Sequence, residues 1–152
     1  MDKRAKHTHG IDRSVVASLR KAWDDICAKP ESQPDTTDLD RLARRFDILS
    51  GKWLVFVSQA QVDAVWSRVA SATHAGTLGT SAKVSPRSDD SNGHVICVFT
   101  RDYTDASDVN KVRDGLRRLR LRDTIGYKPD VYTYCHVYQD NPWNIFPTRY
   151  RQ

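Results

Sequence analysis

Apolar residues recur at helical spacing near the start of the chain. They stand at Val15, Val16, Leu19, Trp23 and Ile26. Ser14 is available as an N-cap and Pro30 breaks the pattern, so we predict a first helix over residues 14–28. Residues 30–37 are rich in proline, serine, threonine and acid, which is typical of a loop.

A second helical stripe follows Asp38 and contains Leu39, Leu42, Phe46 and Leu49. Ser50-Gly51 is typical of a C-cap that ends this helix. Residues 52–57 are apolar, β-branched and aromatic, which predicts a buried strand. Residues 58–61 then resemble a capping box for a helix with a buried stripe of Val62, Val65, Trp66 and Val69.

Glycines interrupt the strand-like segment 76–85, which indicates a bulge or a close approach between backbones. A charged loop over 86–93 leads to residues 94–100, which are almost wholly apolar and predict a central strand. Thr104 or Asp105 then caps a helix that runs to Leu119.

Residues 131–138 alternate with a period of two and predict a last strand. One face of it would carry the aromatic side chains Tyr132, Tyr134 and Tyr138, together with His136. Such a face can stack nucleic-acid bases, and its burial under a helix is the alternative. The tail from Asp140 is too apolar to remain free, so we expect it to pack on the domain.

Strands interleaved with helices, without a repeat, predict an α+β fold in which helices cover a sheet. The length of 152 residues suits one domain. We assign residues 1–12 to a flexible basic arm and residues 13–152 to a single α+β domain, in which the first helix and the loop over 30–37 precede the core.

The three cysteines are odd in number and far apart, which favours a reducing compartment. The N-terminus lacks the apolar stretch of a secretory signal, and no segment approaches the ~20 apolar residues that span a bilayer. We therefore expect a cytoplasmic or nuclear monomer without membrane contact.

The net charge of +5 fits an anionic partner such as RNA or a phosphorylated ligand. Basic residues concentrate on and after the predicted helix that ends at Leu119. Arg113, Arg117 and Arg120 are the candidates there for phosphate contacts, and a solvated helix face is the alternative.

Motifs for catalysis or metal binding are missing at usable spacing, including a P-loop, a nucleophile elbow and a zinc-ligand pairing. Gly76 to Gly79 comes nearest to a phosphate-cradling loop, but no Lys-Ser/Thr and no helix start follow it. We predict that the protein is not an enzyme and uses no metal or cofactor. A cryptic enzyme acting on a phosphorylated substrate remains open, because catalytic partners need to be close only in space.

Four segments carry a resemblance to a known family, namely Gly51 to Val57, Gly76 to Gly79, Tyr127 to Asp130 and Asn141 to Trp143. They resemble the basophilic-leukaemia-expressed (Bles03-like) family of uncharacterised eukaryotic proteins. Residues 50–138 are also similar to the messenger-RNA cap-binding translation initiation factor. The resemblance implies an antiparallel-type curved sheet covered by helices.

The cap-binding factor holds methylated guanine between two tryptophans, and basic residues on a middle strand hold the phosphates. The resemblance places Lys83 and Arg87 near that strand, as candidates for an anionic ligand. Tryptophan is absent from residues 67–142, where a sandwich tryptophan should fall, so classical cap binding is not predicted. Trp66 resembles the tryptophan of an outer groove for partner helices. The helix that carries Trp23 is a candidate to cover that surface.

Together these observations favour a non-enzymatic binding domain for RNA or a nucleotide-like anionic ligand, recognised through Lys83, Arg87 and the basic helix. The first alternative is a protein-interaction module that uses the Trp66 surface. The second is the cryptic enzyme.

Overall fold

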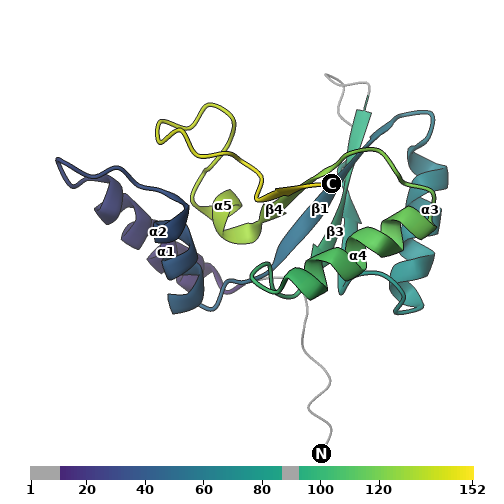
Figure 1. Ribbon diagram of the computed structural model, residues 1–152, viewed down its shortest axis with the longest axis horizontal. Helices are drawn as coiled ribbons and strands as arrows, with labels where there is room; N and C mark the ends of the chain where they lie inside the picture. Colours follow the sequence, from purple (N-terminus) through teal and green to yellow (C-terminus); the bar gives the residue numbers. More distant parts are fainter. Residues whose placement is uncertain (1–10, 87–92) are drawn as a thin grey trace, which may run out of the picture.

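The computed structural model describes residues 11–86 and 93–152 (Figure 1). Arg87 and residues 1–10 of the predicted basic arm lie outside the described residues. In chain order the elements are α1 (Arg13–Cys27), α2 (Thr36–Arg45), β1 (Gly51–Ser58), α3 (Val62–His74), β2 (Ser81–Val84), β3 (Gly93–Thr100), α4 (Ala106–Arg118), β4 (Gly126–Pro129), α5 (Asp130–Tyr134) and β5 (Tyr150–Arg151).

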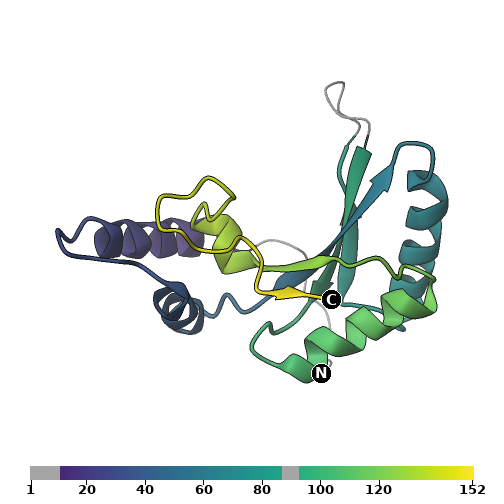
Figure 2. The ribbon, with the colours of Figure 1, turned by 45° about the horizontal axis from the view of Figure 1, so that its top comes forward.

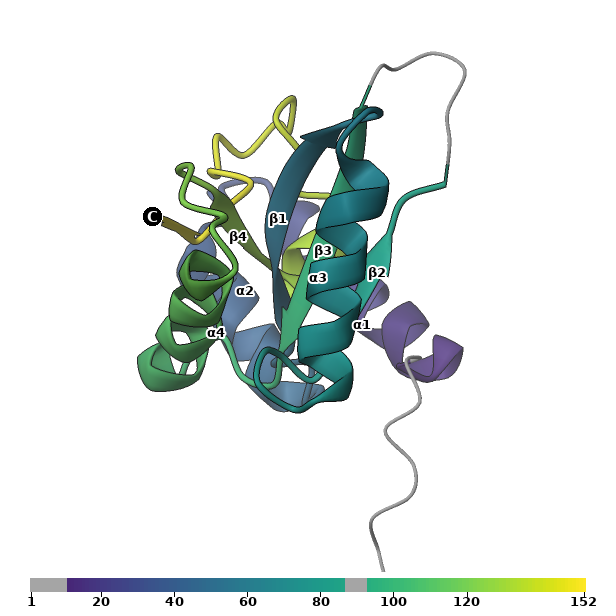
Figure 3. The same ribbon diagram turned by 90° about the vertical axis from the view of Figure 1, so that its right-hand side faces the viewer.

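The strands form one antiparallel sheet in the order β2-β3-β1-β4-β5. Helices α3 and α4 cover one face of the sheet, which we call the α3/α4 face (Figure 3). Helix α5 packs against β1 and β4 on the other face, and α1 and α2 lie beyond it (Figure 2). We call this second face the α5 face. The α+β class and the helix-covered antiparallel sheet are therefore confirmed.

The pleat of β1 explains how its side chains divide between the two faces. Trp53 and Val55 are buried on the α3/α4 face, where the Trp53 Nε1 donates to the carbonyl oxygen of Val109 in α4 at 3.0 Å. Alternation then directs Lys52 and Phe56 to the α5 face. Strand β3 lies between β1 and β2, as the apolar run predicted.

Aspartates cap the first two helices. Ser14 donates its backbone N–H to Asp12 at 2.8 Å, so the predicted Ser14 N-cap is wrong by two residues. Asp35 and Asp38 form a capping box at α2, which therefore begins inside the predicted 30–37 loop. Helix α2 ends at Arg45, so the predicted C-cap at Ser50-Gly51 is also wrong.

Helix α3 lacks the predicted capping box at its start, and a turn joins its end to β2, which is shorter than the predicted strand. The capping box predicted at 58–61 is wrong, because Gln61 is the N-cap of α3 and makes no side-chain capping bond. At the other end, Gly76 has a φ of 75° and Thr77 N donates to the carbonyl oxygen of Ala72, as in a Schellman motif. Gly79 confirms the predicted close approach, since an added Cβ would collide with the carbonyl oxygen of Phe99.

The predicted strand over 131–138 is wrong. The strand in this region is β4, which begins five residues earlier, and Asp130–Tyr134 form α5. Pro129 ends the strand as the N-cap of α5, where its missing N–H costs no helical hydrogen bond. His136 then has a positive φ of 57°. Val131 and Cys135 are both buried and are four residues apart. This spacing places two residues on one face of a helical turn, and it also places them on one face of an alternating strand.

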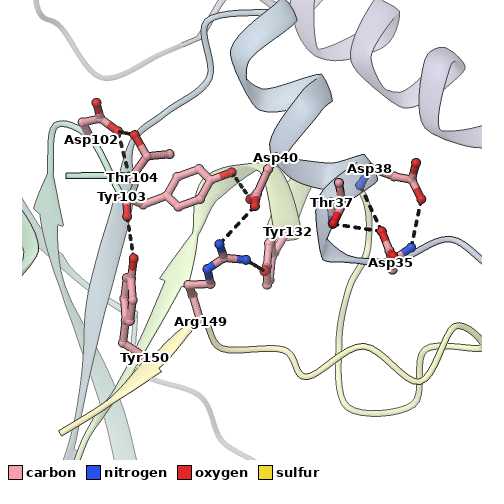
Figure 4. Close-up of polar contacts among 10 residues, drawn as sticks. All are labelled: Asp35, Thr37, Asp38, Asp40, Asp102, Tyr103, Thr104, Tyr132, Arg149 and Tyr150. Carbon is pink, nitrogen blue, oxygen red and sulfur yellow. Dashed lines mark hydrogen bonds and ion pairs between the residues drawn. The ribbon is translucent and has the colours of Figure 1, made fainter. Parts of the chain in front are cut away.

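The tail from Asp140 packs on the fold, as predicted. Trp143 contacts Trp23 of α1 edge-to-face, with ring centroids 5.0 Å apart. Tyr150 and Arg151 form β5 on the edge of β4. Immediately before β5, Arg149 donates to a carboxylate oxygen of Asp40 at 3.0 Å, while Tyr103 donates to the other oxygen at 2.7 Å (Figure 4). This network joins α2 to the sheet and the tail.

Candidate anion-binding site

The register of the sheet brings basic and aromatic side chains together on the α5 face. Lys52 pairs with Phe99 on one side and with Lys128 on the other, and Phe99 pairs with Ser81. Residues directly opposite one another in antiparallel strands point to the same face. Lys83, two residues after Ser81 on β2, also points to this face. Three lysines from three strands therefore share one face of the sheet.

Lys52 is held by α5. Its Nζ donates to the Asp130 carboxylate at 2.6 Å and to the Thr133 hydroxyl at 3.0 Å. The other Asp130 oxygen accepts the Ser50 hydroxyl at 2.6 Å. Lys52 and Asp130 are both buried, so the ammonium group is fixed in place and its charge is balanced.

Lys128 is buried, and no carboxylate of the described residues forms an ion pair with it. Its Nζ donates to the carbonyl oxygen of Val137 at 2.8 Å and lies 4.1 Å from the centroid of the Tyr138 ring. Burial, followed by the nearby charge of Lys52, lowers the pKa of Lys128 to about 8. Its charge is therefore disfavoured unless an anion comes close.

Lys83 is the exposed cation of the group. Its Nζ lies 5.7 Å from the centroid of the Phe99 ring, and the Nζ of Lys52 lies 5.8 Å from the same centroid. Within residues 11–86 and 93–152, neither Lys83 nor Lys128 forms an ion pair. The α5 face thus has an excess of positive charge around an aromatic ring, which is an arrangement that attracts anions.

Apolar side chains continue this surface along β1 and β3. Leu54 pairs with Cys97, and Phe56 pairs with Val95, in the two rows that follow Lys52 and Lys128, with Lys83 on the other side of Cys97. The Phe56 side chain is 74% exposed. The α5 face therefore combines a basic end near α5 and β2 with an apolar end at Phe56.

The predicted basic helix lies on the opposite side of the sheet. Arg113 is buried, and its two Nη atoms donate to the carbonyl oxygens of Leu121 and Asp123 at 2.9 and 2.8 Å. Its guanidinium group holds the loop after α4 and is not on the surface. Arg117 is half-buried and pairs with Asp114, and Arg120 is exposed. Neither shares a face with Lys83.

The three predicted stacking tyrosines do not form a platform. Tyr132 is buried, and its hydroxyl oxygen accepts from Arg149 at 3.4 Å. Tyr134 is half-buried in α5, whereas Tyr138 is 52% exposed beyond the helix. The helical turn and the positive φ of His136 separate the rings, and Tyr138 is the one whose ring contacts the Lys128 ammonium group.

Trp66 is half-buried on α3, beside the buried residues Val65 and Val69. The predicted covering of this surface by α1 is wrong, because α1 packs against α2 and α5 across the sheet (Figures 1 and 3). Trp23 instead contacts Trp143.

A separate hollow lies between the end of α1 and α2. Its lining combines two cations with two carboxylates, so it favours neither anions nor cations. The lining residues are Ile26, Lys29, Pro30, Glu31, Ser32, Gln33, Asp38 and Arg41. This hollow is distinct from the α5 face.

The thiols of two buried cysteines are poor candidates for the nucleophile of a cryptic enzyme. Burial raises the pKa of the Cys97 thiol, and burial raises that of Cys135 to about 12, which opposes thiolate formation. In the part of the chain that the structure describes, no three histidine, cysteine or acidic side chains gather as metal ligands. No described helix has the length and apolarity to cross a bilayer.

Sequence reasoning missed Lys52 and Phe56, and it placed Lys128 only at the end of the basic run that follows the predicted helix. Alternation within 51–58 already sets Lys52 and Phe56 opposite Trp53, and this was the available signal. The pairing of Lys52 with Lys128 had no comparable signal, because it depends on the register between strands distant in sequence.

The sequence matches the family described as "Basophilic leukemia-expressed protein Bles03" over residues 4–136. Among solved structures, the chain is similar to a schistosome eIF4E complexed with m7GpppA and 4E-BP, with 21% sequence identity and a TM-score of 0.52. The match covers 85% of this chain and 66% of the eIF4E chain, so this chain spans just under two thirds of the length of that eIF4E chain. At this identity the likeness shows a shared fold, which confirms the predicted cap-binding-like architecture.

Proposed function

Because the chain belongs to the basophilic leukemia-expressed protein Bles03 family and shares its fold with a cap-binding factor, we propose that it is a non-enzymatic binding domain for a phosphorylated, nucleotide-like ligand. The ligand is a free nucleotide or the phosphorylated end of an RNA chain. Its binding surface is the α5 face.

The observation that carries this proposal is the set of three lysines on one sheet face. Asp130 balances Lys52, whereas Lys83 and Lys128 have no ion pair among the described residues. A bound phosphate would offset the cost of holding the buried Lys128 charge. Two unbalanced ammonium groups, together with the fixed Lys52, are suited to a group that carries more than one negative charge.

The structural neighbour supports the ligand class. The eIF4E structure is complexed with m7GpppA, a phosphorylated dinucleotide, so this fold accommodates such a ligand in another protein. Tryptophan is absent from residues 67–142 here, so the proposal does not extend to a sandwich between two tryptophans. Arg87 stays a candidate contact, since it follows β2 in the sequence.

Calorimetric titration with m7GpppA, GTP and a short 5′-triphosphorylated RNA tests the proposal. Binding is expected to weaken as salt rises from about 50 to 200 mM, because phosphate contacts release counterions. Lys83→Ala is expected to weaken it further. The matched control is Lys21→Ala, which removes an exposed lysine of α1 that pairs with Asp25. Absence of binding by all three ligands, or equal effects of the two substitutions, would overturn the proposal.

A second candidate function is docking of a partner helix on α3. The half-buried Trp66 and the position of α1 across the sheet favour it, and the eIF4E neighbour is complexed with 4E-BP. Titration with a 4E-BP peptide tests this function. Binding that Trp66→Ala abolishes and Lys83→Ala leaves unchanged supports it, and no binding counts against it.

A further inference from the structure

Phe56 is exposed in a way that packing alone does not explain. Its side chain is 74% exposed, although it lies within an eight-residue strand at the centre of the sheet. Its β1 neighbours on the other face, Trp53 and Val55, are buried. Among the residues that the structure describes, the Phe56 ring has no aromatic or cationic partner. One flat apolar ring therefore faces solvent beside the lysines.

The register fixes how far this ring lies from the cations. Phe56 is four residues along β1 from Lys52, which is about 13 Å at the usual rise of a strand. Lys83 lies two strands away from Phe56, in the row of Leu54, which is two residues before Phe56. The Cα atoms of Lys83 and Phe56 are therefore about 12 Å apart. Leu54, Val95 and Cys97 fill the interval with apolar surface. Lys52 and the Phe56 ring are thus at opposite ends of one strip, and Lys83 flanks its middle on β2.

We infer that the α5 face binds a nucleoside polyphosphate, with the base stacked on Phe56 and the terminal phosphates at Lys83, Lys52 and Lys128. This inference rests on the proposed function and adds to it the ligand class and the base contact. A base placed on Phe56 leaves the first phosphate over the Leu54–Cys97 row, which Lys83 flanks from the edge strand β2. The later phosphates of the polyphosphate then reach the ammonium groups of Lys83, Lys52 and Lys128. A nucleoside monophosphate satisfies only one end of the strip.

Stacking suits Phe56 better than the other aromatic side chains of this face. The Tyr138 ring already carries the Lys128 ammonium group 4.1 Å from its centroid. The Phe99 ring has the ammonium groups of Lys52 and Lys83 within 6 Å of its centroid and is only partly exposed. A base presents an uncharged π-face that stacks on a free aromatic ring irrespective of base identity.

Calorimetry with GTP, GMP and inorganic tripolyphosphate, on the full chain, separates the two ends of the site. We expect GTP to bind more tightly than tripolyphosphate and much more tightly than GMP. Phe56→Ala is expected to weaken GTP binding about tenfold, the scale of a lost base–aromatic stack, and to leave tripolyphosphate binding unchanged. The matched control is Phe146→Ala, because Phe146 is 75% exposed on the C-terminal segment.

Phe56→Trp supplies a direct readout, since an exposed ring at this position is replaceable without repacking the core. Its fluorescence is expected to be quenched by GTP and not by tripolyphosphate. If tripolyphosphate binds in a Lys83-dependent manner, but GTP binds no more tightly and Phe56→Ala has no effect, the base contact is overturned while the proposed function stands. If neither ligand binds, both are overturned.

Discussion

The Lys128 ammonium group lies 4.1 Å from the centroid of the Tyr138 ring and donates to the carbonyl oxygen of Val137 at 2.8 Å. These contacts satisfy the ammonium group without neutralising it. Burial and the adjacent Lys52 together hold its pKa at about 8. The charge of the α5 face is therefore sensitive to pH in a range where proteins are routinely handled.

Anion binding at the α5 face is expected to weaken as pH rises from about 7.5 to 9.5. Lys128 is protonated below its pKa of about 8 and loses its charge above it, so binding is stronger on the acidic side. Loss of one cation near the ligand costs about 1 kcal/mol, or roughly fivefold in affinity. The second pKa of a phosphate monoester is near 6, so the phosphate charge of the ligand changes little over this range.

Calorimetry with GTP at several pH values measures this dependence, and Lys128→Met is its control. The variant is expected to bind more weakly at pH 7.5 and to lose most of the pH dependence. A wild-type affinity that is constant across the range would show that Lys128 does not contact the anion.

The buried ion pair between Lys52 and Asp130 is expected to contribute strongly to stability. Asp130→Ala leaves the Lys52 ammonium group buried without its carboxylate, which typically lowers the free energy of unfolding by about 3–5 kcal/mol. Asp114→Ala, which breaks the exposed pair with Arg117, is expected to cost no more than about 1 kcal/mol. Urea denaturation measures both. Equal losses would mean that the buried pair adds nothing beyond an exposed one.

The contacts of Asp40 are expected to hold α2 against the sheet. Asp40→Ala removes the acceptor of the buried Tyr103 hydroxyl and the partner of Arg149, at an expected cost of about 2–3 kcal/mol in the free energy of unfolding. Asp25→Ala, in an exposed pair of α1, serves as the control and is expected to change little. Thermal denaturation compares the two variants, and an Asp40→Ala protein as stable as the control contradicts this role.

Gly51 is expected to tolerate no larger side chain. An added Cβ would overlap the ring and hydroxyl of Tyr127, which is fully buried and hydrogen-bonded to Thr100 at 2.5 Å. Overpacking of this kind costs about 1–3 kcal/mol, so Gly51→Ala should lower the urea midpoint. Adding Tyr127→Phe removes the nearest clashing atom, and a double variant less stable than Gly51→Ala alone would argue against the clash.

Much of the architecture could be predicted because local patterns agreed with the tertiary structure. The β1 and β3 segments are apolar and β-branched, and α3 buries the predicted Val62, Val65 and Val69. The strand over 131–138 was predicted because valine and tyrosine favour strands. In the structure, β1 pairs with residues 126–129 instead, and the residues that follow form a helical turn.

Arg113 shows that a helical stripe also predicts burial for a charged residue. It stands at the spacing of Val109, Val112 and Leu116, which are all buried. Its place on this apolar face was therefore readable, although its carbonyl partners were not. The candidate site was harder to predict, since Lys52, Lys83 and Lys128 are brought together by strand register alone.

The contact between Asp40 and Arg149 joins positions 109 residues apart, and Trp23 meets Trp143 over a similar distance. Closing such long loops is slow, because the entropy is lost before the contact forms. While the protein is being synthesised, α1 and α2 have only each other to pack against until α5 and the segment that carries Trp143 and Arg149 have left the ribosome. Their apolar faces stay partly exposed up to that point, so we expect chaperones that bind apolar segments to act on the nascent chain at this stage.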